Sequence, residues 1–233
     1  MKKFIAILLC FAVLLPGKTA VFANENVFFY SLDNVNNLQT PDSLNGAAAA
    51  LSTNSVLTGG IDNMGIFLDG KGSNITIPLA NRNISSLSFW IKPKFHTALS
   101  GKMSLLSSGI FELFVSAPDK KINLKIGEKS AVGSACFEDN KWYNIVVTAN
   151  ASSVFVYVNG NKEAALEDSF SFSICQSIAV GSTDDNYFRA VVDEVIGYSY
   201  VLSENNASDI CKSFSLKLAA WDNEYYPKTE SYP

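Results

Sequence analysis

The sequence has few of the residues on which metal and nucleophilic sites are commonly built. It holds a single histidine, His96, and four cysteines. No CxxC pair and no cysteine–histidine spacing typical of a zinc site occurs. His96 follows the end of an expected strand and has no serine or cysteine motif beside it, so we expect no catalytic histidine.

Positive charge is also scarce. Arg82 and Arg189 are the two arginines, and the 233 residues include 18 basic and 22 acidic side chains. Residues 1–23 contribute three lysines and no acids, so without them the balance is 15 against 22, a net charge near −7. Binding to nucleic acid or to anionic lipid needs a basic stripe, so neither is expected as a partner.

Long hydrophobic runs are absent except at the N-terminus. Two lysines precede an apolar run at residues 4–15, and Val21-Phe22-Ala23 then provides side chains that a signal peptidase accepts. The run is about a dozen residues long, short of the roughly twenty that span a bilayer. The sequence therefore predicts a signal peptide over residues 1–23, a secreted protein, and no membrane insertion after cleavage.

Cleavage would leave a chain of 210 residues with Cys136, Cys175 and Cys211. This length is enough to bury one core without metals or cross-links, so one domain is expected at residues 24–215, with a tail at 216–233. An odd number of cysteines allows one disulfide and a free thiol, or three thiols. The sequence does not choose among the pairings.

What the sequence contains in abundance is the pattern of β-strands. Residues 142–148 are almost continuously apolar, as in a strand covered on both faces, and residues 154–158 follow as a second strand. Asn159-Gly160-Asn161 can take the positive φ angles of a tight hairpin turn. Further strands are expected at residues 26–32, 65–68, 74–77, 87–91, 111–115, 122–126, 131–137, 178–181 and 189–200.

Turn residues recur about every eight to twelve positions, which is typical of a β-sandwich. Residues 40–60 are interpreted as a polar loop rich in alanine and glycine. The one helix expected is short, Glu204–Phe214, with Ser203 as its N-cap. The predicted fold class is all-β: a sandwich of two antiparallel sheets with one short helix near the C-terminus.

Four motifs resemble those of a known family in their order and spacing. They are LDG followed by ITIP at residues 68–78, LSFWIKP at 87–93, WYNIVVT with VYVNG at 142–160, and VDEVIGYSYVLSE at 192–204. Together they resemble the LamG-like, concanavalin A-like jelly-roll family. The resemblance implies two curved antiparallel sheets and, often, binding of carbohydrate or a cell-surface ligand, but it does not imply one function.

Within this framework, four aromatic residues are candidates for stacking on a sugar ring. Trp90 alternates with the apolar residues of its strand, so it lies on the face away from them. Tyr157 lies on a neighbouring strand, while Tyr187 and Phe188 lie on a loop, where burial is harder to arrange. Each ring has a structural alternative, a buried or half-buried position in the sheet.

The resemblance also implies a structural Ca²⁺ ion. In the family, an aspartate at the head of the Asp-Glu-Val strand often holds calcium together with backbone carbonyls, since calcium prefers several oxygen ligands. Asp193 stands at that position, and Asp69 and Gly70 stand at the turn that would supply carbonyls. The alternative is that Asp193 only forms hydrogen bonds to a neighbouring loop.

Support for catalysis is weak, because glycosidases place two carboxylates on one cleft, about 5 Å apart in retaining enzymes. Asp193 and Glu194 are adjacent and would point to opposite faces of a strand. Glu163, Glu167 and Asp168 fall in an expected turn region and are interpreted as solvated charges. Three classes stay open: a non-catalytic module binding a glycan or cell-surface ligand, which we expect, a structural or assembly protein of the cell envelope, and a glycan-cleaving enzyme.

Overall fold

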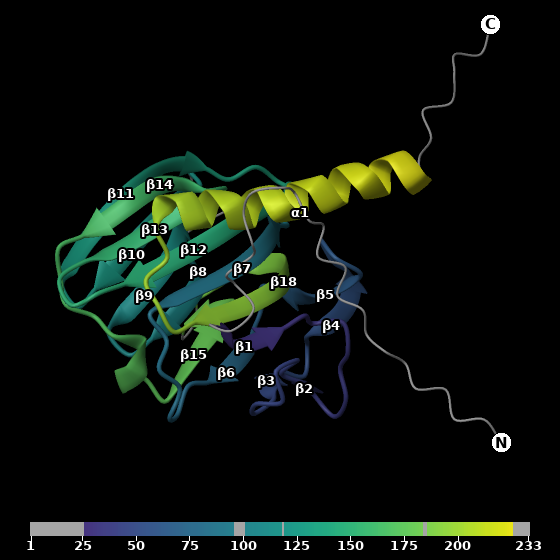
Figure 1. Ribbon diagram of the computed structural model, residues 1–233, viewed down its shortest axis with the longest axis horizontal. Helices are drawn as coiled ribbons and strands as arrows, with labels where there is room; N and C mark the ends of the chain where they lie inside the picture. The colour runs from purple at the N-terminus through teal and green to yellow at the C-terminus, as the bar shows by residue number, and fades with distance from the viewer. Residues whose placement is uncertain (1–25, 96–100, 118, 184–185, 226–233) are drawn as a thin grey trace, which may run out of the picture.

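The computed structural model describes residues 26–95, 101–117, 119–183 and 186–225 (Figure 1). In these ranges the strands form two large antiparallel sheets that pack face to face, and one α-helix lies across the outside of the first (Figure 1). The fold class predicted from the sequence is confirmed. The signal peptide predicted at residues 1–23 and His96 lie outside the described residues.

The first sheet, called sheet A, has the strand order β14-β13-β12-β7-β18-β5-β4, and β1 pairs with the end of β18. Its central strands are buried along almost their whole length, because the core covers one face and the helix covers the other. The strands are β1 (Asn26–Tyr30), β4 (Val56–Gly59), β5 (Met64–Asp69), β7 (Ser86–Pro93), β12 (Tyr143–Ala149), β13 (Val154–Val158), β14 (Asn161–Leu166) and β18 (Arg189–Tyr198).

The second sheet, called sheet B, has the order β11-β10-β9-β8-β15-β6-β3-β2. A small hairpin of β16 (Ser182–Thr183) and β17 (Asn186–Tyr187) lies next to β8. The strands of sheet B are β2 (Gln39–Thr40), β3 (Ala49–Leu51), β6 (Ile75–Pro78), β8 (Lys102–Ser108), β9 (Phe111–Ser116), β10 (Lys121–Ile126), β11 (Lys129–Cys136) and β15 (Ser177–Val180).

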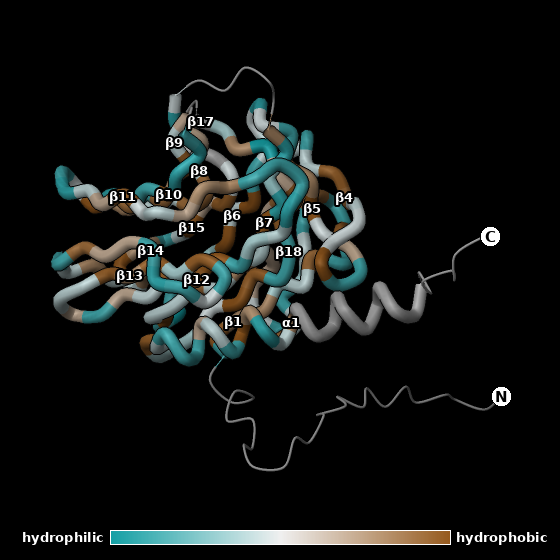
Figure 2. The backbone as a smooth tube through the Cα atoms, turned by 90° about the horizontal axis from the view of Figure 1, so that it is seen from above, coloured by the Kyte–Doolittle hydropathy of each residue, from teal (hydrophilic) through white to brown (hydrophobic). Residues whose placement is uncertain are grey.

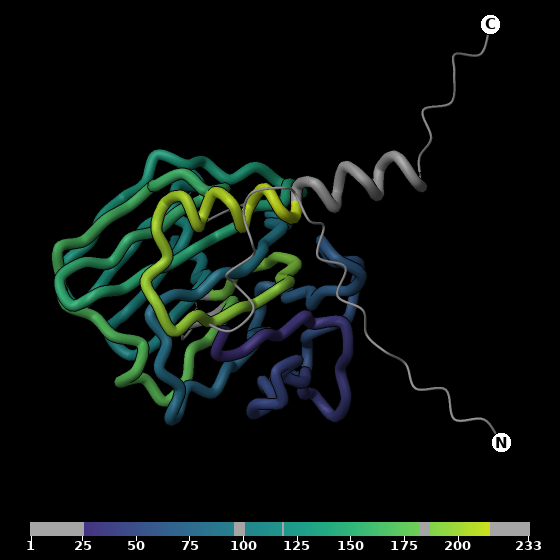
Figure 3. The backbone as a smooth tube through the Cα atoms, viewed as in Figure 1, coloured from purple at the N-terminus to yellow at the C-terminus, as the bar shows by residue number. Residues whose placement is uncertain are grey.

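The core lies between the two sheets and follows the two-residue period of the strands. In β7, Leu87, Phe89 and Ile91 point into it, as expected from their spacing. Figure 2 shows hydrophobic stretches along the central strands. Figure 3 shows that the first described strand, β1, lies beside β18 from the far end of the chain, so the sandwich is closed by contacts distant in sequence.

The helix α1 (Glu204–Tyr225) begins where the sequence predicted. Ser203 is its N-cap: Ser203 Oγ accepts a hydrogen bond from Asn206 N, and Asn206 Oδ1 accepts one from Ser203 N. The helix ends eleven residues beyond the predicted Phe214. Residues 215–225 contain no glycine or proline, and Pro227 follows, so nothing in the sequence stops the helix earlier.

Three segments of the structure differ from the sequence-based prediction. The expected loop at residues 40–60 contains β3 and β4, which are short strands with little alternation. Strand β8 was not predicted, because a register shift between Ser104 and Leu106 interrupts its apolar period. Residues 161–166 were assigned to a turn and form β14, which begins with three polar residues.

Candidate functional site

Helix α1 covers the face of sheet A that carries Trp90. The ring of Trp90 is 3 % exposed and lies 5.5 Å, centroid to centroid, from the ring of Phe214 in α1. Ile61 and Cys211 pack around the same pair. The indole presents no open face to a sugar, and its Nε1 has no hydrogen-bond partner among the described residues.

Tyr157 lies under the first turns of the same helix. It is 6 % exposed and packs with Val146, Tyr198, Leu202 and Ala207. Burial raises the pKa of Tyr157, and the nearby charge of Glu204 raises it further. The positions of Trp90 and Tyr157 match the structural alternative that the sequence allowed, and the geometry lends no support to a stacking role.

Tyr187 and Phe188 were predicted to lie on a loop, but Tyr187 lies in β17 and Phe188 directly follows it. Their environments differ. Phe188 is 1 % exposed and contacts the ring of Phe95 edge to face, with centroids 6.2 Å apart. Tyr187, in β17, is partly exposed. Neighbouring residues of an extended chain point to opposite sides, so Tyr187 points away from the core that holds Phe188. Of the four predicted stacking residues, Tyr187 is the one whose side chain is accessible.

The predicted calcium ligand Asp193 is completely buried. Its Oδ2 accepts hydrogen bonds from Ile61 N (2.8 Å) and Asp62 N (3.1 Å), and its Oδ1 accepts one from Glu194 N (2.8 Å). Burial raises the pKa of Asp193 to about 7, against the effect of these donors. A Cβ atom at Gly60 would lie 2.3 Å from Oδ2, so the close approach of this loop depends on glycine.

The other predicted calcium residues lie elsewhere on the sheet. Asp69 Oδ1 accepts hydrogen bonds from Lys71 N and from the N and Oγ of Ser73, so it organises its own turn, in which Gly70 has φ +72°. Asp69 pairs with Arg189, four residues before Asp193 along β18, which places the two aspartates about 13 Å apart. In the described ranges no three His, Cys, Asp or Glu side chains gather as a metal site requires.

Glu163 has a structural role that the sequence did not reveal. Its Oε2 accepts hydrogen bonds from Ser134 N, Ser134 Oγ and Ala135 N, all on β11. Glu163 itself lies on β14, so this carboxylate joins the edges of the two sheets. Its interpretation as a solvated turn charge was wrong, because the two sheet edges that it connects are far apart in the sequence.

No disulfide joins the cysteines of the described residues.

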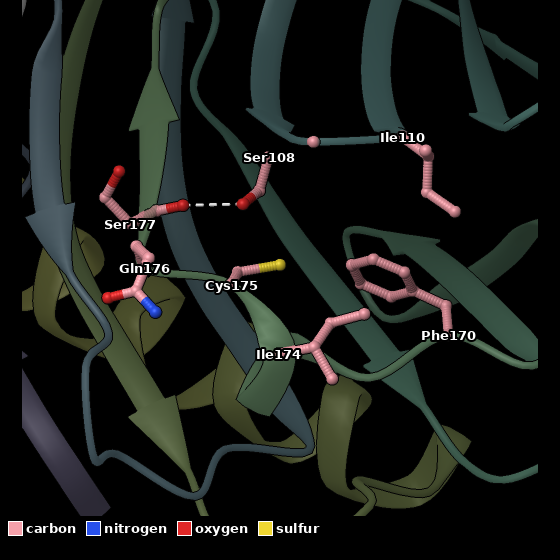
Figure 4. Close-up of a pocket in the computed structure, with 8 residues that line it drawn as sticks. Ser108, Ile110, Phe170, Ile174, Cys175, Gln176 and Ser177 are labelled. Carbon is pink, nitrogen blue, oxygen red and sulfur yellow. Dashed lines mark hydrogen bonds between the residues drawn. The ribbon is translucent and has the colours of Figure 1, made fainter.

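A pocket of about 420 Å³ opens beside the turn between β8 and β9 (Figure 4). Its other wall comes from the 3₁₀ helix η2 (Phe172–Ile174) and the residues on either side of it. No residue of the lining is charged. The lining residues are Ser108, Gly109, Ile110, Phe170, Ile174, Cys175, Gln176 and Ser177.

Three phenylalanines hold the η2 side of the pocket in place. Phe170 stacks on Phe111 at 4.9 Å and meets Phe172 edge to face at 5.0 Å. Phe172 is completely buried, and Ser171 caps the short helix by accepting a hydrogen bond from Ser173 N. With these rings anchored in the core, Ile174 is turned outward and is 72 % exposed.

The opposite wall is the tip of the β8–β9 hairpin. Gly109 takes φ +56°, a conformation that glycine adopts readily, and Ile110 beside it is 58 % exposed. Two exposed isoleucines thus flank one opening. One sequence signal for this pocket is the isoleucine that directly follows Ser108-Gly109 at the turn. No site was predicted there from the sequence.

Polar groups belong to both walls of the pocket. Figure 4 shows Ser108 and Ile110 on the side of the β8–β9 turn, and Phe170, Ile174 and Cys175 on the η2 side. Ser108 Oγ donates to the carbonyl of Ser177, which leaves its oxygen able to accept a hydrogen bond. A pocket with mostly apolar walls and a few polar groups is typical of sites for small ligands.

The two packed antiparallel sheets define a β-sandwich domain. A family model described as the concanavalin A-like lectin/glucanases superfamily matches residues 69–208. This is more than half of the chain, and the chain therefore belongs to that superfamily. The resemblance noted in the sequence motifs is confirmed. No curated protein matches the chain in sequence.

Several solved structures share the fold. Domain 4 of AbnA, a GH43 extracellular arabinanase from Geobacillus stearothermophilus in complex with arabinotriose, is 21 % identical over 80 % of this chain and 98 % of its own, with a TM-score of 0.65. The binding domain of Paraclostridial Mosquitocidal Protein 1 is 17 % identical over 82 % of this chain and 52 % of its own, with a TM-score of 0.64.

A Trypanosoma rangeli sialidase in complex with 2,3-difluorosialic acid is 17 % identical over 81 % of this chain and 33 % of its own, with a TM-score of 0.68. This chain thus spans about half of the mosquitocidal binding domain and a third of the sialidase. At such identities the likeness shows the fold alone.

Within the described ranges, no helix is both long and apolar enough to cross a membrane.

Proposed function

We propose that this chain is a secreted, non-catalytic module that binds a glycan in the pocket between the β8–β9 turn and η2. The observation that carries the proposal is the composition of the pocket, in which apolar side chains face a serine hydroxyl and no charge is present. A sugar ring has the same two kinds of surface, C–H groups and hydroxyls. The structural neighbours add support, since the arabinanase domain was solved with arabinotriose.

The pocket composition also favours binding over cleavage. Glycoside hydrolysis by the usual route needs two carboxylates flanking the bond. The described residues that line the pocket include no aspartate or glutamate. Secretion is supported by the N-terminal pattern of residues 1–23 and by the extracellular arabinanase among the neighbours.

A glycan array probed with the secreted protein tests the proposal, followed by titration of each hit. Ile174→Ser should weaken binding by about fivefold or more, because it removes apolar contact from one wall. Val132→Ser is the matched control, since Val132 is 61 % exposed on β11 and lies outside the pocket lining. Both variants should melt like the wild type, because both side chains are mostly solvent-exposed.

Equal binding by the Ile174→Ser variant and the wild type would place the glycan elsewhere, with the partly exposed Tyr187 as the next position to vary. Binding of no glycan would contradict the proposed function and leave the envelope-assembly alternative. Reducing sugar released from a bound polysaccharide by the wild type would support the glycan-cleaving enzyme instead.

A further inference from the structure

If the proposed function holds, the lack of charged residues in the pocket lining restricts the kind of sugar that the pocket binds. An acidic sugar would bring a carboxylate into a pocket whose described lining has no cation. Removing a carboxylate from water without a charged or hydrogen-bonding partner is unfavourable. A neutral sugar carries no such penalty.

Neither arginine of the chain is available to supply the missing charge. Arg82 Nη2 lies 3.1 Å from Asp42 Oδ2, and Arg82 Nη1 donates to the hydroxyl of Tyr30. Arg189 donates to the carbonyl of Lys94 and lies over the ring of Phe67. Both guanidinium groups are therefore part of the framework, and neither lines the pocket.

A lysine that contacts the segment before Phe170 is also engaged. Lys129 Nζ lies 3.3 Å from Asp168 Oδ2 and donates to the carbonyl of Glu167, in the segment that precedes Phe170. Asp168 neutralises that ammonium group. The approach to this side of the pocket thus offers an acidic sugar no unpaired cation from these residues.

The apolar walls restrict the sugar further. Ile110 and Ile174 offer a hydroxyl no hydrogen-bond partner, whereas a methyl group beside them would gain apolar contact. The hydroxyl of Ser108, which donates to a carbonyl, can still accept a hydrogen bond, and the exposed amide of Gln176 can donate or accept one.

The size of the pocket favours the end of a glycan chain. Its volume of about 420 Å³ lies near the lower end of the range for small-ligand sites, roughly 300–1,000 Å³. Two separated segments, residues 108–110 and 170–177, bound it. A terminal unit fits such a pocket better than a stretch of polysaccharide lying along a sheet.

We propose that the pocket binds the terminal unit of a neutral glycan that carries a methyl group, with the methyl group between Ile110 and Ile174. Two sugar chemistries supply such a group: C6 of a 6-deoxyhexose and the acetyl group of an N-acetylhexosamine. The proposal rests on the proposed function and specifies its ligand class.

Titration calorimetry with pairs of sugars that differ at one chemical group tests this proposal. L-Fucose and L-galactose differ at C6, where a methyl group replaces a hydroxymethyl group, and N-acetylglucosamine and glucose differ in the acetamido group. In at least one pair, the methyl-bearing sugar should bind about tenfold more tightly, the lower end of what a small apolar group contributes in a fitted pocket. Glucuronic acid, which differs from glucose by a carboxylate at C6, should bind no more tightly than glucose.

Substitutions of the two isoleucines test whether they cause the preference for methyl-bearing sugars. Ile110→Ser and Ile174→Ser should each reduce the preference for the methyl-bearing sugar several-fold, while Val132→Ser should leave it unchanged. Three results would each overturn the inference and leave glycan binding intact: no methyl preference in either pair, tighter binding of glucuronic acid than of glucose, or a methyl preference that survives both isoleucine substitutions. Binding of no sugar in the set or on the array would overturn the proposed function itself.

Discussion

Trp90 and Phe214 form an aromatic pair, with ring centroids 5.5 Å apart and an angle of 56° between the planes. The pair joins β7 at the centre of sheet A to helix α1, 124 positions further along the chain. It turns the aromatic outer face of sheet A into a helix–sheet interface. The accessible apolar side chains with a pocket between them lie instead at the β8–β9 turn and η2.

Phe214→Ala should destabilise the protein by about 2–4 kcal/mol, because Phe214 is 9 % exposed and its loss leaves a cavity over Trp90. Urea unfolding of the wild type and the variant measures the difference. Ser213→Ala is the control on the same helix, since Ser213 is exposed, and it should change stability by less than about 0.5 kcal/mol. An unchanged Phe214→Ala variant would mean that α1 does not stabilise sheet A.

Asp193 should make stability depend on pH. Burial raises the pKa of its carboxyl group in the folded protein to about 7, above its ordinary value of 3.8. The folded state therefore binds more protons than the unfolded state between these values, so the contribution of Asp193 to stability falls as pH rises from about 4 through 7 and then levels off.

Melting temperatures at pH 5, 6, 7 and 8 in the presence of EDTA measure this dependence. In Asp193→Asn the side chain no longer titrates, so the difference in slope between the two proteins isolates Asp193. Because Asn also presents an NH₂ group to the backbone donors, the variant should be less stable at every pH. Parallel curves for both proteins would show that Asp193 titrates near its ordinary pKa.

The calcium site implied by the family resemblance gives a separate prediction. If Ca²⁺ binds Asp193, millimolar calcium should raise the melting temperature relative to EDTA, since a ligand that binds only the folded state stabilises it. The rise should be larger at pH 8 than at pH 6, because calcium needs the ionised carboxylate. Identical melting in calcium and EDTA at pH 8 would leave Asp193 as a hydrogen-bonding residue alone.

Glu163 should stabilise the joined edges of the two sheets. Glu163→Ala removes three hydrogen bonds to β11 and should lower the free energy of unfolding by about 1–2 kcal/mol. Glu163→Gln keeps an accepting oxygen and should cost less. Glu167→Ala removes an exposed carboxylate of the same charge nearby and serves as the control. Equal stability of the Glu163→Ala and Glu167→Ala variants would contradict this role.

Much of the fold was predictable because its determinants are local. The β12–β13 hairpin follows from two apolar strands, and the turn after β13 follows from Asn159 and Gly160, which take φ +50° and +80° as their residue types allow. The N-cap of α1 follows from Ser203 in the same way. Strand β8 was missed for a local reason too, since its bulge breaks the two-residue period.

By itself, the sequence determined the class of fold and the face of β7 on which Trp90 lies, because alternation along a strand is set by backbone geometry. Only the tertiary structure decided that Phe214 covers this face, that backbone amides of residues 61 and 62 meet Asp193, and that two distant segments enclose an uncharged pocket. These contacts join residues far apart in the chain, and local periodicity carries no information about which distant surface will cover an outward side chain.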